Sequence, residues 1–290
     1  MVYLSHFYFP DRETEYAYLM REQKTCFDSY YPFKVLSGRN LFNMGFEPVT
    51  ILCGGNGCGK TTALNVIGET LNLKRDTLYN RSSFFDDYTD MCDYRLYSSL
   101  PESSRVITSD DVFDYMLNLR SINEGIDIKR EELLEDYLDN KYAEFRFRTL
   151  EDYDKLKKVN LARRTTKSKY VRKSLMDNIR ENSNGESAFK YFVEKIDLPG
   201  LYLLDEPENS LSPDKQIEFK EYIENSVRIG CQFIIATHSP FMMALKDALI
   251  YDLNGESAEI KKWTEIENVK VYYNFFKKHE KEFNNEQNKE

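Results

Sequence analysis

Short, continuously apolar runs recur along the chain, and each of them ends at a polar or glycine-rich segment. They occupy residues 48–53, 201–204 and 231–237, and a fourth run ends near Thr108. Runs of this length are typical of buried strands, and ligands of open α/β sheets bind at the carboxyl ends of such strands. Helical spacing follows the first run over residues 61–72 and begins again near Asp111. The pattern therefore predicts an α/β fold.

Other patterns occupy the two ends and the middle of the chain. Residues 129–156 have helical spacing with mixed charge, which is most often a solvated amphipathic face. Residues 268–283 predict a closing helix, whose aromatic side chains we expect to be packing residues. The segment from residue 1 to about residue 53, which includes the stretches 30–36 and 46–52, is interpreted as the source of antiparallel strands that accompany the α/β core.

Composition narrows the class of protein without choosing the number of domains. The 290 residues suffice for one large domain or two smaller ones, and the net charge of -9 argues against polyanion binding by the whole surface. No apolar run reaches the length of a membrane span, and no secretory signal pattern is present. The five cysteines are scattered without a C-x-x-C pair, which fits a reducing cytosol; they are Cys26, Cys53, Cys58, Cys92 and Cys231. We therefore expect a soluble cytoplasmic protein.

A glycine-rich turn connects the first apolar run to the helical segment after it. Gly54, Gly59, Lys60 and Thr61 match G-x-x-x-x-G-K-[ST], the pattern of a phosphate-binding loop. Glycines allow successive N–H groups to converge on phosphate oxygens, and the next helix directs its positive N-terminal end at the same anion. The alternative is a turn with an incidental lysine, which the flanking strand and helix disfavour. The predicted nucleotide-binding residues are Gly54, Asn56, Gly57, Cys58, Gly59, Lys60, Thr61 and Thr62.

Two later strands deliver reactive side chains to their carboxyl ends. Asp205 and Glu206 follow the run at 201–204; beside a phosphate loop, we expect Asp205 and Thr61 to hold Mg²⁺ while Glu206 polarises the attacking water. In isolation, a solvated acidic pair would be the simpler interpretation. His238 follows the next run, where a ring nitrogen could approach the γ phosphate, although a lone histidine there is more often a capping or packing residue. The predicted catalytic residues are Glu206, His238 and Lys60.

In this order, the three motifs resemble those of ABC-type ATPases. Residues 54–61 resemble Walker A, residues 201–206 resemble Walker B with its catalytic glutamate, and His238 resembles the switch histidine. Two further motifs support the resemblance. Residues 183–187, with Ser183, Gly185 and Glu186, resemble a degenerate signature, and residues 208–213, with Asn209 and Ser210, resemble the D-loop. Alone, the signature stretch would be merely a helix start. As a whole, the chain is similar to short standalone AAA-family ATPases related to SMC, RecF and OLD-type proteins of DNA repair and anti-phage defence.

The resemblance implies a fold, cofactors and an assembly. It implies a P-loop NTPase core of the ABC type with a mostly helical inserted lobe, which binds ATP and Mg²⁺ and hydrolyses ATP slowly, under stimulation by a ligand or partner. It also implies a homodimer around ATP, in which Ser183 and Gly185 of one protomer face the γ phosphate bound by Lys60 of the other. The expected division is a core over residues 1–75 and 190–275, a lobe over 76–189 and a tail over 276–290.

One element of the family pattern is missing. ABC proteins usually carry a Q-loop glutamine between Walker A and the signature, whereas this chain has no glutamine in that interval. The equivalent stretch is residues 104–116, where Ser109 and Asp110 are the candidates to replace it. Cys58 stands where relatives often have serine, so alkylation of a reachable thiol is expected to block ATP binding.

A basic run interrupts the acidic chain shortly before the signature. Residues 155–173 contain nine Lys or Arg and no Asp or Glu. Such a run could neutralise several phosphates of DNA or RNA; the alternatives are a solvated basic face or a surface that docks an acidic partner protein. The nine residues, called the basic patch below, are Lys155, Lys157, Lys158, Arg163, Arg164, Lys167, Lys169, Arg172 and Lys173.

Three classes of function remain open. An ATP-driven switch or clamp, acting on nucleic acid or on a separately encoded effector such as a nuclease, is favoured by the whole-chain resemblance and the basic patch. The nucleotide-binding subunit of a membrane transporter is disfavoured by the missing Q-loop glutamine, and we expect no membrane contact. The third class, a regulatory module that binds ATP with little turnover, is disfavoured by the intact pair of Asp205 and Glu206.

Overall fold

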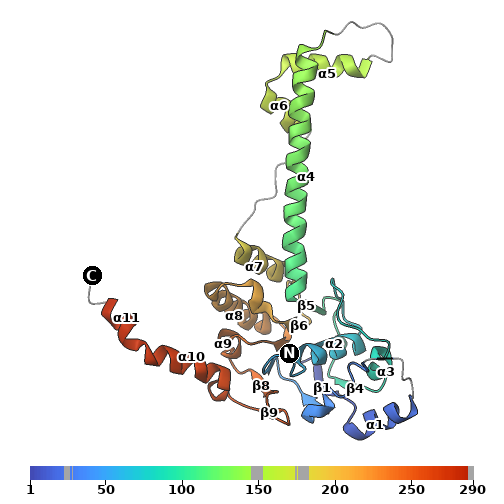
Figure 1. Cartoon of the computed structure of the whole chain (residues 1–290), viewed down its shortest axis with the longest axis vertical. Helices are drawn as coiled ribbons and strands as arrows, with labels where there is room; N and C mark the ends of the chain where they lie inside the picture. Colours follow the sequence, from blue (N-terminus) through green and yellow to red (C-terminus); the bar gives the residue numbers. More distant parts are fainter. Residues whose placement is uncertain (23–26, 28, 145–152, 174, 176–182, 287–290) are drawn as a thin grey trace. The chain divides into compact units, whose positions relative to one another are not determined.

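The computed structural model describes residues 1–22, 27, 29–144, 153–173, 175 and 183–286 (Figure 1). Residues 1–113 together with 184–290 form one unit, called the sheet unit below, and residues 114–183 form a second, called the helical unit. No helix in the described ranges is both long and apolar enough to cross a lipid bilayer.

A six-stranded sheet forms the centre of the sheet unit, in the order β5-β6-β7-β3-β8-β9. Its parallel strands are β3 (Val49–Cys53), β5 (Arg105–Thr108), β6 (Leu201–Asp205), β7 (Gln232–Ala236) and β8 (Leu249–Asp252), and β9 (Glu259–Ile260) runs antiparallel to β8. Every residue of β3, β6 and β7 is buried. Strands covered on both faces show no polar alternation, which explains the continuous apolar runs. The predicted α/β fold is confirmed.

Helices connect the parallel strands. α2 (Lys60–Thr70) follows β3, α8 (Pro213–Arg228) connects β6 to β7, and the short α9 (Pro240–Met243) follows β7 (Figure 1). α2 lies close against the sheet because Gly68 has no side chain: a Cβ there would be 2.7 Å from Cγ2 of Val106. α7 (Asn184–Lys195), which begins in the signature, packs on α8 with the rings of Phe192 and Phe219 4.6 Å apart.

A small antiparallel sheet accompanies the core. Two of its strands lie within residues 1–53, as predicted, but not in the two stretches named there. Its order is β2-β1-β4, formed by β1 (Leu4–Tyr8), β2 (Asn43–Gly45) and β4 (Asp93–Leu96). Residues 30–36 form turns, because Pro32 offers no N–H to a ladder and Lys34 has a left-handed φ of 68°. Residues 49–52 of the other predicted segment pair in parallel within the central sheet. The assignment of both segments to antiparallel strands is therefore wrong.

Three short helices complete this part of the sheet unit. They are α1 (Arg12–Arg21), the 3₁₀ helix η1 (Ser37–Arg39) and α3 (Phe85–Thr89). α1 is anchored by Glu15, which is 2% exposed and accepts hydrogen bonds from Lys34 N at 2.7 Å and Ser37 Oγ at 2.6 Å. The turns around residue 34 are thereby fixed between α1 and the phosphate loop.

Three helices form the described part of the helical unit. α4 (Ser109–Tyr142) begins in the sheet unit and continues into the helical unit, which also contains α5 (Tyr153–Arg164) and α6 (Lys167–Arg172). Tyr137, Ala162 and Tyr170 form a small core between them, and Tyr170 Oη donates to Asp136 at 2.9 Å. Because the apolar side chains of α5 and α6 face this core, all nine residues of the basic patch are exposed.

The observed units differ from the predicted boundaries in two places. Residues 76–113, which we expected in the lobe, belong to the sheet unit, because they contribute β4 and β5. α7 belongs to the same unit, so the signature helix is not part of the helical unit. β5 is an edge strand of the central sheet. The first segment of the sheet unit therefore ends at Phe113, whereas the predicted core segment ended at residue 75.

The C-terminal helices are more exposed than expected. The 3₁₀ helix η4 (Trp263–Glu265) leads into α10 (Glu267–Lys278) and α11 (Glu280–Glu286). Only Val269 of α10 is buried, whereas its aromatic residues Tyr272, Tyr273, Phe275 and Phe276 are 48–62% exposed. α10 lies mainly against η4 and α11 rather than on the sheet. The prediction that these aromatics are packing residues is therefore wrong for the described part of the chain.

Candidate nucleotide-binding site

The phosphate-loop motif lies between the end of β3 and the start of α2. Gly54 and Gly59 have φ values of 148° and 100°, in the range that residues with a side chain avoid. A Cβ on Gly54 would also be 2.7 Å from Sγ of Cys58, and one on Gly59 would be 3.1 Å from Leu36. The backbone of the loop therefore requires glycine at both positions, where the motif has it.

Lys60 is the first residue of α2 and is only 5% exposed. Its Nζ donates to the backbone oxygens of Gly54 at 3.1 Å and Gly55 at 3.3 Å, and lies 2.8 Å from Nε2 of His238. The role of Nε2 as donor or acceptor depends on the tautomer of the ring. The loop thus holds a lysine whose ammonium group is bound by two backbone oxygens, which a phosphate oxygen could replace.

Thr61 and Asp205 form the candidate metal site. Thr61 Oγ1 donates to Asp205 Oδ1 at 3.1 Å. Burial raises the pKa of the Asp205 carboxyl to about 6, and the neighbouring charge of Glu206 acts in the same direction. The hydrogen bond from Thr61 lowers the pKa and offsets part of this shift. A hydroxyl and a carboxylate fit Mg²⁺, which keeps several waters and takes phosphate oxygens as further ligands. In the described ranges no group of three or more His, Cys, Asp or Glu offers an all-protein metal cage.

Glu206 has a left-handed backbone, with φ 48° and ψ 51°. Such a conformation costs a residue other than glycine on the order of 1 kcal/mol or more and is often found where function requires it. One carboxylate oxygen lies 3.4 Å from Nε2 of His238, and the other accepts from Nδ2 of Asn209 at 2.9 Å. Since the side chain is 30% exposed, the carboxylate is oriented and still reachable by water.

Glu208 begins the predicted D-loop stretch, although no role was predicted for it, and it fixes the segment that carries His238. Its Oε1 accepts from the backbone N–H groups of His238 at 2.5 Å and Ser239 at 3.1 Å. Ser239 Oγ in turn donates to Gln216 of α8 at 2.7 Å. Glu208 belongs to the 3₁₀ helix η3 (Pro207–Ser210), which also contains the D-loop residues. The turn after β6 is thereby tied to the turn after β7, and the only sequence signal for Glu208 was its place between two motif residues.

The carboxyl ends of three parallel strands meet at this site. β3 leads to Lys60 and Thr61, β6 ends at Asp205 and Glu206, and β7 leads to His238. A cavity of about 570 Å³ adjoins the phosphate loop and is lined by Gly54, Gly55, Asn56, His238, Met243, Asn254, Ile266, Glu267, Asn268 and Val271. The structure therefore places the predicted Walker A, Walker B and switch residues around one point.

The signature residues lie elsewhere. Gly185 is in the first turn of α7, where the nearest atoms to a Cβ would belong to Ser212 and Lys215 at the start of α8. Neither neighbour is part of the phosphate loop. Ser183 and Glu186 flank Gly185 and are exposed. Within one chain the loop and the signature thus form two separate parts.

The region expected to replace the Q-loop has a different inward-facing residue. Ser109 is half-buried and Asp110 is exposed at the start of α4, whereas Asp111 is 3% exposed. Asp111 Oδ2 accepts from Thr108 N at 2.6 Å and Thr108 Oγ1 at 3.0 Å. Thr108 is the register partner of Asp205 in the sheet. The inward-facing acidic residue of this stretch is therefore Asp111, one position after the predicted candidates.

Cys58 does not present its thiol to solvent. The residue is 3% exposed and belongs to the main apolar core, with Sγ directed at Gly54. The expected block of ATP binding by alkylation required a reachable thiol, and the described structure does not offer one.

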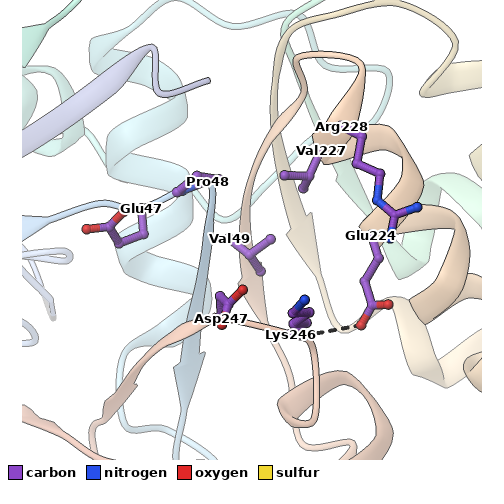
Figure 2. Close-up of a pocket in the computed structure, with 8 residues that line it drawn as sticks. All are labelled: Glu47, Pro48, Val49, Glu224, Val227, Arg228, Lys246 and Asp247. Atoms are coloured by element: carbon purple, nitrogen blue, oxygen red, sulfur yellow. Dashed lines mark hydrogen bonds between the residues drawn. The ribbon is translucent and has the colours of Figure 1, made fainter.

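A second hollow lies away from these residues, and Figure 2 shows the eight side chains that line it. Its volume is about 380 Å³, and it includes Val49, at the amino end of β3, while the phosphate loop follows the carboxyl end of the same strand. Lys246 N donates to Glu224 at 3.2 Å across it. This hollow shares no residue with the candidate nucleotide site.

A protein-family comparison supports the resemblance in the second half of the site. The family model described as "AAA domain, putative AbiEii toxin, Type IV TA system" matches residues 178–244. That segment contains the signature, β6 with Asp205 and Glu206, and His238, but not the phosphate loop. The match confirms the predicted resemblance to ABC-type AAA ATPases. No curated protein matches the chain significantly.

Solved structures with a similar fold include SMC heads and an ABC cassette. The SMC head domain from Thermotoga maritima is 16% identical with a TM-score of 0.40, covering 76% of this chain and 92% of that one. An Smc head domain from Pyrococcus furiosus, bound to the C-terminal domain of ScpA, is 14% identical with a TM-score of 0.39, covering 76% and 91%. A nucleotide-free ATP-binding cassette from an ABC transporter is 16% identical with a TM-score of 0.38, covering 79% and 86%. At these scores the likenesses carry no argument about function.

Proposed function

We propose that this chain, an ABC-type AAA ATPase by its P-loop fold and motifs, binds ATP with Mg²⁺ and hydrolyses it to ADP and phosphate. The observation that carries the proposal is the convergence of three strand ends. Lys60 lies 2.8 Å from His238, His238 lies 3.4 Å from Glu206, and Thr61 lies 3.1 Å from Asp205. A cation, a carboxylate reachable by water and a pair of hard oxygen ligands are the groups that phosphoryl transfer to water requires.

Each residue has a role that its position supports. Lys60 exchanges its backbone acceptors for phosphate oxygens, to which the N-terminus of α2 is also directed. Thr61 and Asp205 hold Mg²⁺, which supplies positive charge to the phosphates. Glu206 accepts a hydrogen bond from the attacking water and orients it, while Asn209 holds the second carboxylate oxygen. His238 contacts both Lys60 and Glu206 and is positioned by Glu208 to sense the γ phosphate.

Phosphate release from ATP tests this proposal. The wild-type chain is expected to release phosphate, and Lys60→Ala is expected to lose affinity for the nucleotide. Glu206→Gln is expected to bind ATP but to hydrolyse it at least about 10²-fold more slowly than the wild type. Glu218→Gln is the matched control, because Glu218 is an exposed glutamate of α8 that pairs only on the surface with Lys215. Equal turnover by wild type and Glu206→Gln would contradict the assigned role of Glu206.

We further propose an ATP-dependent homodimer. The first turn of α7, with Gly185 and the exposed Ser183 and Glu186, offers an N-terminal helix end to an anion, but it lies apart from the phosphate loop of its own chain. A second copy could bring this helix end to the open side of the nucleotide. Symmetric use of the two parts then gives two equivalent composite sites.

The basic patch supports a nucleic-acid partner as the finer part of the proposal. Nine exposed cations lie on α5, on α6 or directly after α6, in a chain with a net charge of -9, and they concentrate positive charge in this part of the helical unit. We therefore propose a switch or clamp whose turnover responds to DNA or RNA. A separate effector, and a place in DNA repair or anti-phage defence, are predictions of the family resemblance.

A further inference from the structure

Residues 74–79 run along the edge of β5 as a short extended segment. Lys74 forms a parallel bridge with Arg105, and the Lys74 carbonyl accepts from Val106 N at 2.9 Å. Side chains then alternate: those of residues 75, 77 and 79 are half-buried, and those of 76 and 78 are exposed. Thr77 Oγ1 lies 3.3 Å from Thr108 Oγ1, at the end of β5 and in register with Asp205. The segment thus passes directly beside the metal site.

The inner side of this segment carries Arg75. Burial lowers the pKa of its guanidinium, and the negative charges of Asp111, Asp205 and Glu69 oppose that shift. Arg75 Nη2 donates to Asn65 at 2.6 Å, but its buried Nε has no hydrogen-bond partner in the described ranges. Asp111 Oδ1 is likewise buried without a partner among the described residues. A buried polar group left unpaired costs about 1–3 kcal/mol. Arg75 and Asp111 therefore have an unused capacity to pair when the charge at Asp205 changes.

The outer side carries Asp76, which holds the far end of the signature helix. Asp76 Oδ2 accepts from Lys195 Nζ at 2.6 Å and from Tyr191 Oη at 3.2 Å. The hydrogen bond from Lys195, more than the other contacts, lowers the pKa of Asp76, so the carboxylate is charged at neutral pH. Lys195 is the last residue of α7, whose first turn contains Gly185. Two consecutive residues, Arg75 and Asp76, thus face the metal-site side and α7 respectively.

We propose that Arg75 and Asp76 are positioning residues that couple the metal carboxylate of a protomer to its own signature helix. This inference rests on the proposed ATPase function and deepens it. Neutralisation of Asp205 by a divalent cation would remove one of the negative charges around Arg75 and leave Asp111, already the strongest of them, and Glu69 as its counter-charges. Because Asp76 is covalently next to Arg75 and binds α7 directly, the adjustment reaches α7. The signature is thereby set by the occupancy of the same chain's phosphate loop, the task that a Q-loop glutamine usually performs.

Hydrogen exchange of α7 on addition of Mg²⁺ and ADP tests the coupling without turnover, and ADP avoids dimerisation around ATP. We expect exchange of residues 184–195 to change at least about twofold in the wild type, and not in Asp76→Asn or Lys195→Met. Lys190→Met is the matched control, because Lys190 is an exposed lysine of the same helix whose ion pair in the described ranges is with Glu194 on that helix, at 3.7 Å. Affinity for a fluorescent ADP analogue should stay within about twofold in all four proteins, which also shows that the variants are folded.

Steady-state kinetics give the second readout. Asp76→Asn and Lys195→Met are expected to lower kcat about 5- to 20-fold with KM within about twofold, since coupling energies of this kind change rates or affinities by such factors. An unchanged α7 response in Asp76→Asn, no response in a wild type that binds ADP, or a KM change as large as that in kcat would overturn the coupling. A wild type that binds no nucleotide would overturn the proposed function itself, and the coupling with it.

Discussion

At the scale of single residues, the site is a small set of charges held in unfavourable surroundings. Lys60 is nearly buried beside backbone oxygens and a histidine. Asp205 is 9% exposed, and among the residues that the structure describes Thr61 is its one side-chain hydrogen-bond partner. Glu206 has a left-handed backbone. These features do not stabilise the fold, because buried charges and strained backbone cost free energy. They are explained when Mg²⁺ and a phosphate chain provide the missing partners.

Asp205→Asn is expected to stabilise the nucleotide-free protein. Burial raises the pKa of Asp205 from 3.8 to about 6, so its favourable contribution is present below pH 3.8 and is lost as pH rises through about 6. Asparagine cannot ionise, so at pH 7 without Mg²⁺ the variant should gain about 1–3 kcal/mol of unfolding free energy, a gain that disappears near pH 4. Denaturant unfolding at several pH values measures this. A variant less stable than wild type at pH 7 would contradict it.

The same substitution should weaken the response to Mg²⁺. Removal of Mg²⁺ by EDTA is expected to lower ATP affinity of the wild type at least several-fold, and to change that of Asp205→Asn much less, because a neutral amide is a poorer Mg²⁺ ligand than a carboxylate. Titration of a fluorescent ATP analogue with and without EDTA compares the two. An equal loss in both proteins would show that Asp205 does not hold the metal.

At the scale of elements, glycine contacts place the helices that build the site. α2 rests on the sheet at Gly68, close to Val106, and the loop before it packs on Leu36 at Gly59. The turns around residue 34 are held in place by the hydrogen bond from Lys34 N to Glu15 of α1. The site is therefore sensitive to side-chain volume at positions that never touch the ligand.

Gly68→Ala and Gly125→Ala are expected to have opposite effects on stability. A methyl group at Gly68 would be 2.7 Å from Val106, whose branched side chain is stiff, so overpacking should cost about 1–3 kcal/mol. At Gly125 in α4 nothing lies within 4 Å, and alanine should add about 0.5–1 kcal/mol through its better helix propensity. Urea unfolding followed by circular dichroism compares them. Stabilisation by Gly68→Ala would contradict the close contact of α2 with the sheet.

The elements also show how far sequence reasoning reaches. Buried parallel strands and the motifs after them could be predicted, because an uninterrupted apolar run and a glycine loop are local signals. The segment at 30–36 could not, since apolar residues in a packed turn resemble a strand until Pro32 and Lys34 are seen in three dimensions. Glu208, Arg75 and Asp111 were missed for a related reason. Their roles come from partners distant in sequence, such as His238 for Glu208, and no local pattern marks them.

At the scale of the whole molecule, the chain combines two units with different surfaces. The sheet unit carries the nucleotide site and the signature helix, and the helical unit carries the basic patch. α4 starts beside Asp111 in the first unit and continues as one helix into the second.

Salt dependence tests the basic patch. If its cations contact phosphates, affinity for DNA or RNA should fall about 10²- to 10³-fold between about 50 and 200 mM salt. Binding should be abolished when glutamate replaces four patch residues together, Lys155, Lys157, Lys158 and Arg163. The same change at Lys270, Lys277, Lys278 and Lys281, which are exposed on α10 and α11, should have little effect and controls for net charge. Binding that survives the four patch changes would exclude the patch as the nucleic-acid site.

The most direct test of the account is the molar mass of Glu206→Gln by light scattering, with and without ATP and Mg²⁺. The account predicts 34.3 kDa without nucleotide and twice that mass with it, each protomer retaining one ATP. Addition of Lys60→Ala to the same chain should abolish the shift, because the phosphate loop then no longer holds ATP. A Glu206→Gln chain that binds ATP and stays at 34.3 kDa would contradict the composite site, and one that binds no ATP would contradict the assigned function as a whole.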